Sequence, residues 1–277
     1  MPTPPEKQRT VFFVSDRTGI TAEALGRSLM SQFDGAAFRQ VTLPFISDVD
    51  KANAAVARIN AAGSADGVRP IVFSTIVDDA MRVIIQRSQA LYLDFFAAFI
   101  GPLENELGVK SSHTVGRAHA SADNAAYIQR IEAVNFALAN DDGVSTRNYP
   151  KADVILAGVS RSGKTPTCLY LALQYGVFAA NYPLTEDDLK RGQLPEALLP
   201  YRNKLYGLTI DPERLQQIRH HRRPNSHYSS SNQVRYEVRQ AEDVFRAAGV
   251  PCMNTTLPSI EEIATTVLHQ TGIKRRF

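Results

Sequence analysis

The chain has 277 residues, a hydrophobic content of 44% and a formal net charge of +3. It is long and apolar enough for one large or two ordinary domains, and its near-neutral charge argues against a nucleic-acid partner. Two cysteines are too few for a disulfide framework. The polar N-terminus lacks a secretory signal, and no apolar run is long enough to span a membrane. We therefore expect a cytoplasmic protein without a membrane partner.

Strands and helices alternate through the first half of the chain. Three short apolar strands are each followed by a segment with apolar residues along one side, as in a helix that packs on a sheet. The strands are expected at 11–14, 38–44 and 70–75, and the helices at 22–33, 51–62 and 78–88. A further helix is expected over 95–107, kinked or divided at Gly101-Pro102. This alternation predicts a mostly parallel sheet with helices on both faces.

A polar segment from 109 to 122 interrupts this pattern. Its His113, Arg117 and His119 lack the spacing of a metal site, so we expect the segment to be flexible or to contact phosphate. A helix is expected over residues 124–139. We place the domain boundary after residue 148, which gives an N-terminal α/β domain, 1–148, and a C-terminal α/β domain, 149–277.

The second half alternates again. Strands are expected at 152–157, 177–182, 204–210 and 251–256, and helices at 166–174, 212–222 and 233–247. A last helix begins at Ser259, where serine and the glutamate three residues later form a capping box. Between the second and third strands lies a polar excursion, 185–202, whose Leu194, Leu198 and Leu199 are positioned to cover a site.

A phosphate-binding motif joins the first strand and helix of this second half. The motif is G-x-x-x-x-G-K-[ST], spelled by Gly158, Val159, Ser160, Arg161, Ser162, Gly163, Lys164 and Thr165. In such a P-loop, backbone N–H groups and the helix dipole bind an anion. Lys164 is expected to neutralise the outer phosphates and Thr165 to place its hydroxyl on Mg²⁺. Arg161 either points a second cation at the anion or faces solvent, and the sequence favours neither.

An apolar strand ends in an acid at Asp211. P-loop proteins use an acid at such a position to orient Mg²⁺ or to accept a proton, so we expect a catalytic role. The competing interpretation is a helix N-cap, because Pro212 follows it. The string Asn203-Lys204-Leu205-Tyr206 lacks the aspartate of the guanine-recognition motif N-K-x-D, which makes adenine the expected base.

Two further segments are weaker candidates. The turn Ser15-Asp16-Arg17-Thr18-Gly19 can bind an anion or a phosphorylated side chain, but Ser, Asp and Thr at a helix start are also ordinary caps. The tail Arg219-His220-His221-Arg222-Arg223 is most simply a solvated helix end that complements the helix dipole. A docking surface for a phosphorylated partner is the alternative.

Several strings together resemble the phosphoenolpyruvate synthase and pyruvate, phosphate dikinase regulatory proteins. They are Val14-Ser15-Asp16 with Thr18, Thr21-Ala22-Glu23, Met30-Ser31-Gln32-Phe33, Thr42-Leu43-Pro44-Phe45, Gly67-Val68-Arg69-Pro70, Asp141-Asp142-Gly143, Gly158 through Pro166, Ala180-Asn181-Tyr182-Pro183, Gly207 through Leu215, and Glu261-Glu262-Ile263-Ala264. The resemblance covers nearly the whole chain, without a departure in the P-loop or at Asp211.

The resemblance implies a bifunctional enzyme. As a serine/threonine kinase it would transfer a phosphoryl group from ADP to a threonine of phosphoenolpyruvate synthase and inactivate that enzyme. As a phosphorylase it would remove the group with inorganic phosphate and release pyrophosphate. Lys164 and Mg²⁺ on Thr165 would serve both directions, with Asp211 as the base. Without the resemblance, a small-molecule P-loop kinase and a non-catalytic nucleotide sensor remain open, and a homodimer is compatible with the sequence.

Overall fold

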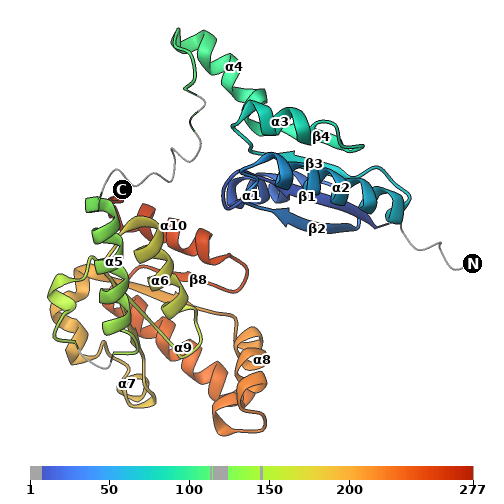
Figure 1. The fold of residues 1–277 in the computed structure, drawn as a ribbon. Helices are drawn as coiled ribbons and strands as arrows, with labels where there is room; N and C mark the ends of the chain where they lie inside the picture. Colours follow the sequence, from blue (N-terminus) through green and yellow to red (C-terminus); the bar gives the residue numbers. More distant parts are fainter. Residues whose placement is uncertain (1–7, 113, 115–123, 144–145, 277) are drawn as a thin grey trace, which may run out of the picture. The chain divides into compact units, whose positions relative to one another are not determined.

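The computed structural model describes residues 8–112, 114, 124–143 and 146–276 of the chain. Two compact units are present, Met1–Ala120 and Ser121–Phe277. Each unit is an α/β layer structure built on its own sheet, as the alternation of strands and helices predicts (Figure 1). Within the described residues, no helix combines the length and the apolar character that crossing a membrane would require.

The first unit contains a four-stranded parallel sheet in the order β2-β1-β3-β4. Its strands are β1 (Arg9–Val14), β2 (Phe38–Leu43), β3 (Ile71–Ser74) and β4 (Leu91–Asp94). Its helices are α1 (Ile20–Met30), α2 (Val49–Asp66), α3 (Asp79–Ile85) and α4 (Phe95–Leu107). Helices α2 and α3 bury one face of the sheet in a cluster around Phe12 and Ile59, and α1 covers the other around Phe13 and Ala22 (Figure 1).

Two features of this unit depart from the pattern in the sequence. Strand β4 was not predicted: the expected helix began at residue 95, and the four residues before it are too few to show a strand period. Helix α4 is a single element that includes Pro102, rather than two helices divided at Gly101-Pro102. The three predicted strands and the helix that follows each of them are present.

The second unit contains another four-stranded parallel sheet, in the order β6-β5-β7-β8. The strands are β5 (Val154–Gly158), β6 (Ala179–Pro183), β7 (Leu205–Thr209) and β8 (Cys252–Asn254). The helices are α5 (Asn124–Ala139), α6 (Lys164–Tyr175), α7 (Glu186–Arg191), α8 (Pro212–Arg222), α9 (Ser231–Ala248) and α10 (Ile260–Thr271). Helices α5, α6 and α10 cover one face, and α7, α8 and α9 contribute to the core on the other (Figure 1).

Helix α5 belongs to the second unit. Its Ala133 and Ala137 are buried in the same apolar cluster as Leu156 of β5 and Leu171 of α6. A boundary after residue 148 would separate α5 from these partners, whereas the compact units divide after Ala120. The sequence did not identify this association because a helix that precedes a strand has apolar residues suited to either neighbouring sheet.

The excursion 185–202 has secondary structure of its own. It contains α7 and most of a 3₁₀ helix, Glu196–Lys204. Leu194 and Leu198 are buried in the core beside α9, so they do not serve as a cover over a site, and Leu199 is exposed. The expectation was wrong for the two buried leucines, because burial of apolar area in the core is the stronger effect on large aliphatic side chains.

Candidate phosphate-binding site

The P-loop leaves the carboxyl end of strand β5 and enters helix α6, as the motif predicts. Its first glycine is required by packing: a Cβ on Gly158 would overlap the carbonyl oxygen of Leu208 on the neighbouring strand β7. Its second, Gly163, has φ +89°, a left-handed conformation that favours glycine. Gly163 is also the N-cap of α6 and offers no side-chain acceptor, so the first-turn amides remain available to a ligand.

A cavity of about 300 Å³ lies inside this loop. Its lining residues are Asp142, Ser160, Arg161, Gly163, Lys164, Thr165 and Pro166. Arg161 adopts φ +75°, and its side chain is exposed while it lines the cavity. The side chain of Arg161 is thus solvated at the rim of the cavity, and its contact with an anion stays a prediction.

Lys164 is a buried cation, with 5% of its surface exposed. Its Nζ donates a hydrogen bond to the carbonyl oxygen of Val159 at 2.9 Å, and among the described residues no carboxylate forms an ion pair with it. Burial lowers the pKa of Lys164 to about 8, although the charges of Asp142 and Asp141 oppose that shift. A buried ammonium group held by a neutral oxygen is a strong binding point for a phosphate.

Thr165 lies beside an acidic turn at the end of α5. Its Oγ1 donates to Asp141 Oδ1 at 2.8 Å, and the side-chain amide of Asn181 on β6 donates to the same oxygen. The N–H of Asp142 donates to Asn181 Oδ1 at 2.9 Å, which fixes the turn to the sheet. Asp142 has φ +53°, so the backbone bends sharply here.

The oxygens of Thr165 and Asp141 suit Mg²⁺, a hard cation that is commonly held by one or two carboxylates together with phosphate oxygens. The described residues contain no group of three or more His, Cys, Asp or Glu side chains that would form a metal cage. The donors present fit a cation that is bound together with a phosphate-bearing substrate. Mg²⁺ would supply neutralisation of phosphate charge at this place.

Asp141 and Asp142 were not identified as site residues in the sequence, where Asp141-Asp142-Gly143 followed the helix expected over 124–139 and was used as one of the strings that carry the resemblance. A signal was present, since two adjacent acids before a glycine are an unusual helix end and sit poorly with the helix dipole. Only the packing of α5 against α6 brings this turn to the P-loop.

Asp211 lies at the carboxyl end of the sheet, two residues after the end of β7. Its Oδ1 accepts hydrogen bonds from the N–H groups of Glu213 at 2.9 Å and Arg214 at 3.1 Å, which makes it the N-cap of α8. It does not line the 300 Å³ cavity. The capping interpretation thus has a direct observation behind it, and the catalytic role of Asp211 stays a prediction.

The basic tail of α8 is not uniformly solvated. His220, His221, Arg222 and Arg223 are exposed, in line with a helix end that complements the dipole. Arg219, in contrast, is completely buried and donates to the carbonyl oxygen of Ser160 in the P-loop. For this arginine the expectation of a solvated side chain was wrong, because the helix repeat turns it toward the sheet.

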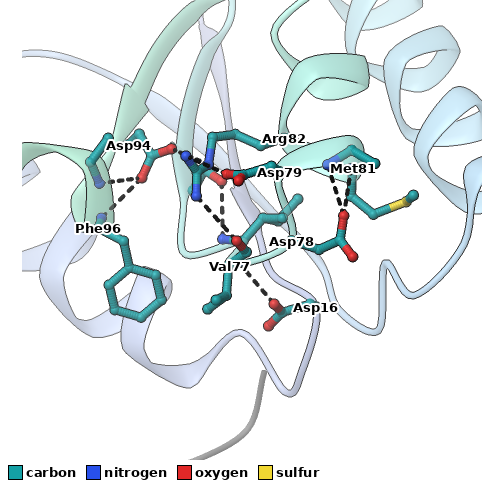
Figure 2. Close-up of polar contacts among 12 residues, drawn as sticks. Asp16, Val77, Asp78, Asp79, Met81, Arg82, Asp94 and Phe96 are labelled. Atoms are coloured by element: carbon teal, nitrogen blue, oxygen red, sulfur yellow. Dashed lines mark hydrogen bonds and ion pairs between the residues drawn. The ribbon is translucent and has the colours of Figure 1, made fainter. Parts of the chain in front are cut away.

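The turn after β1 forms a second hollow, in the first unit. Ser15, Asp16 and Arg17 line a cavity of about 500 Å³ together with residues of α4 and the segment after it. Figure 2 shows Asp16 accepting a hydrogen bond from the N–H of Val77, at 2.9 Å. No side chain of the turn caps α1, so the interpretation of ordinary caps does not hold here. His113, Arg117 and His119 lie outside the described residues.

Comparison with known proteins agrees with these features. A model of the kinase/pyrophosphorylase family matches residues 11–268. The chain is 56% identical over 271 residues to a phosphoenolpyruvate synthase regulatory protein named in Alkalilimnicola ehrlichii, covering 98% of each. It is 55% identical over 270 residues to one in Pseudomonas putida strain GB-1, covering 98% of this chain and 99% of the relative. Such similarity implies a phosphotransferase, and the chain belongs to the kinase/pyrophosphorylase family.

Proposed function

We propose that the protein regulates phosphoenolpyruvate synthase by transferring a phosphoryl group to and from a threonine of that enzyme. The name of the relatives supports the target. In the kinase direction the donor is ADP, and in the reverse direction inorganic phosphate removes the group and leaves as pyrophosphate. The second unit carries this chemistry, and we assign docking of the target to the first unit.

The observation that carries the proposal is the buried Lys164 in a P-loop whose cavity also contains Asp142. The ammonium group of Lys164 is held by a neutral oxygen, so it favours an anionic ligand. The exposed carboxylate of Asp142 beside it is able to exchange a proton with the bound substrate. Phosphoryl transfer depends mainly on positioning and charge neutralisation, and these groups provide both.

In the kinase direction the threonine Oγ attacks the β-phosphorus of ADP. The bond from that phosphorus to the bridging oxygen breaks, and AMP leaves. We assign acceptance of the threonine proton to Asp142 rather than to Asp211, because Asp142 lines the cavity and Asp211 does not. Lys164 and the loop N–H groups neutralise the charge that develops on the leaving phosphate.

In the phosphorylase direction inorganic phosphate occupies the place of the AMP phosphate. One of its oxygens attacks the phosphorus of phosphothreonine, the bond from phosphorus to Oγ breaks, and pyrophosphate forms. The threonine oxygen takes up a proton, which Asp142 in its acid form supplies. A single cradle with two exchangeable occupants therefore accounts for both activities.

Labelled substrates test the proposal. Purified protein is incubated with phosphoenolpyruvate synthase and ADP carrying label in its β-phosphate. The synthase is supplied phosphorylated on its catalytic histidine, because the family resemblance implies that this form is the target. We expect label on a threonine of the synthase. Addition of inorganic phosphate without nucleotide is expected to release the label as pyrophosphate. Lys164→Ala, which removes the shared cation, is expected to abolish both reactions.

Three results would contradict the proposal. Labelling that requires ATP, or label released by water as free phosphate, would indicate an ordinary protein kinase or phosphatase. Turnover of ADP with a small acceptor and none with the synthase would indicate a small-molecule kinase. Binding of ADP without turnover under all these conditions would indicate a nucleotide sensor.

A further inference from the structure

Arg219 connects three elements of the second unit to the P-loop. From helix α8 its Nη2 donates to Ser160 O at 3.1 Å and to Glu237 Oε2 on α9 at 2.6 Å. Its Nη1 donates to the carbonyl oxygen of Tyr228 at 3.2 Å, in the segment between α8 and α9. The side chain is 0% exposed, so these bonds fix its position without competition from water.

Tyr228 adds a second link to the same loop residue. The guanidinium carbon of Arg219 lies 4.3 Å from the centroid of the Tyr228 ring, and the Tyr228 hydroxyl lies 2.9 Å from Ser160 Oγ. Glu237 is held in turn by Gln233, whose side-chain amide donates to Oε1 at 3.0 Å. Both the backbone and the side chain of Ser160 are thereby tied to one buried network.

The carbonyl held by Arg219 belongs to the peptide group between Ser160 and Arg161. No peptide bond among the described residues is cis, and in a trans peptide the C=O and N–H point in opposite directions. Arg219 is not among the residues that line the cavity, whereas Ser160 and Arg161 are. With the Ser160 oxygen drawn toward Arg219, the Arg161 N–H points away from Arg219, and we infer that it faces the cavity that Arg161 lines.

The conformation that results is a strained one. Arg161 has φ +75°, which costs a non-glycine residue about 1–2 kcal/mol. Among the described residues, no acceptor in the chain takes the Arg161 N–H. A strained residue with a free N–H at the rim of a phosphate cavity requires another group to maintain it, and the bonds from Arg219 do so.

We propose that Arg219 is a positioning residue that keeps the Ser160–Arg161 peptide turned so that the Arg161 N–H binds phosphate. The inference rests on the proposed function in that it takes the cavity to be the phosphate site. Without Arg219 the peptide is free to flip and relieve the strain at Arg161. The flip would remove one N–H donor and present a carbonyl oxygen to the anion.

The test measures binding of inorganic phosphate and of ADP by calorimetry, and it needs no target protein. Arg219→Gln is expected to bind phosphate and ADP about 10- to 100-fold more weakly than the wild type, because one hydrogen bond to a charged ligand is lost. Arg219→Lys keeps the charge and one donor and is expected to restore part of the affinity. Arg214→Gln, an exposed arginine on the same helix, is the matched control and is expected to leave affinity unchanged.

A second readout follows the peptide itself. In ¹⁵N-labelled wild-type protein the Arg161 amide resonance is expected to shift when inorganic phosphate is added, and in Arg219→Gln this shift is expected to be lost. If Arg219→Gln fails to fold, Glu237→Gln carries the same test, because it leaves the guanidinium but loosens it. We expect about 3- to 10-fold weaker phosphate binding in that variant.

The outcomes separate this inference from the proposed function. If the wild type binds neither phosphate nor ADP, the assignment of the cavity fails. If the wild type binds both and Lys164→Ala does not, while Arg219→Gln binds normally at a lower melting temperature, Arg219 is merely structural and the inference is overturned. Normal phosphate binding and an unchanged Arg161 shift in Glu237→Gln overturn it equally.

Discussion

Replacing Lys164 with methionine is predicted to stabilise the protein while abolishing its activity. Only 5% of the surface of Lys164 is exposed, and this burial lowers its pKa from 10.5 to about 8. The difference of about 2.5 between these pKa values corresponds to about 3 kcal/mol of unfavourable free energy in the folded protein at pH 7, since one pKa unit is worth about 1.4 kcal/mol. Methionine has a similar length and carries no charge.

The net gain is smaller than this penalty. Lys164→Met also removes the hydrogen bond from Nζ to Val159 O, which contributes about 1 kcal/mol. We therefore expect the ligand-free variant to be about 2 kcal/mol more stable than the wild type at pH 7. Phosphate binding is expected to be lost, because the buried cation is its main attraction.

The pH dependence identifies the cause. Above pH 10.5 the lysine is neutral in both the folded and the unfolded chain, so the penalty is absent. As the pH falls toward about 8 the unfolded chain binds a proton that the folded chain does not, and the wild type loses stability relative to the variant. Below about pH 8 the advantage of Lys164→Met is constant.

Urea unfolding of both proteins at pH 7, 9 and 10.5 measures this advantage, and taking the difference between the proteins cancels the titration of other groups. Lys274→Met, at an exposed position, is the control, and it is expected to change the stability by no more than about 0.5 kcal/mol. A variant less stable than the wild type at pH 7 would refute the reasoning. The reasoning would also be refuted if Lys164→Met exceeded the wild type in free energy of unfolding by the same amount at pH 7 and at pH 10.5.

Four further substitutions test other parts of the site. Asp142→Asn is expected to lower turnover about a hundredfold or more in both directions. Asp211→Asn is expected to lower turnover less, since asparagine caps a helix about as well as aspartate. The reverse order of the two losses in steady-state assays would return the base to Asp211. Gly158→Ala is expected to destabilise the protein by roughly 2 kcal/mol or more in urea unfolding, because the new Cβ overlaps Leu208 O; wild-type stability would contradict this packing. Thr165→Ala is expected to raise the Mg²⁺ concentration for half-maximal turnover about tenfold, and an unchanged Mg²⁺ titration would remove this hydroxyl from the metal site.

The two α/β halves and the P-loop were predictable from the sequence because their signals are local. A buried strand followed by a helix has its own periodicity, and the motif from Gly158 to Thr165 needs only its own residues to form a phosphate cradle. The short edge strand β4 has too few residues to show a period, which is why it was missed.

Tertiary structure alone decided which side chains meet this cradle. Asp141 and Asp142 reach it because α5 packs on α6, although Asp142 lies 22 positions before Lys164 in the chain. Arg219 reaches it because one position in a basic helix tail turns inward, while its four neighbours remain in solvent. Local patterns report the helix or strand to which a residue belongs, whereas its partners depend on burial of apolar area over the whole unit, which no short segment encodes.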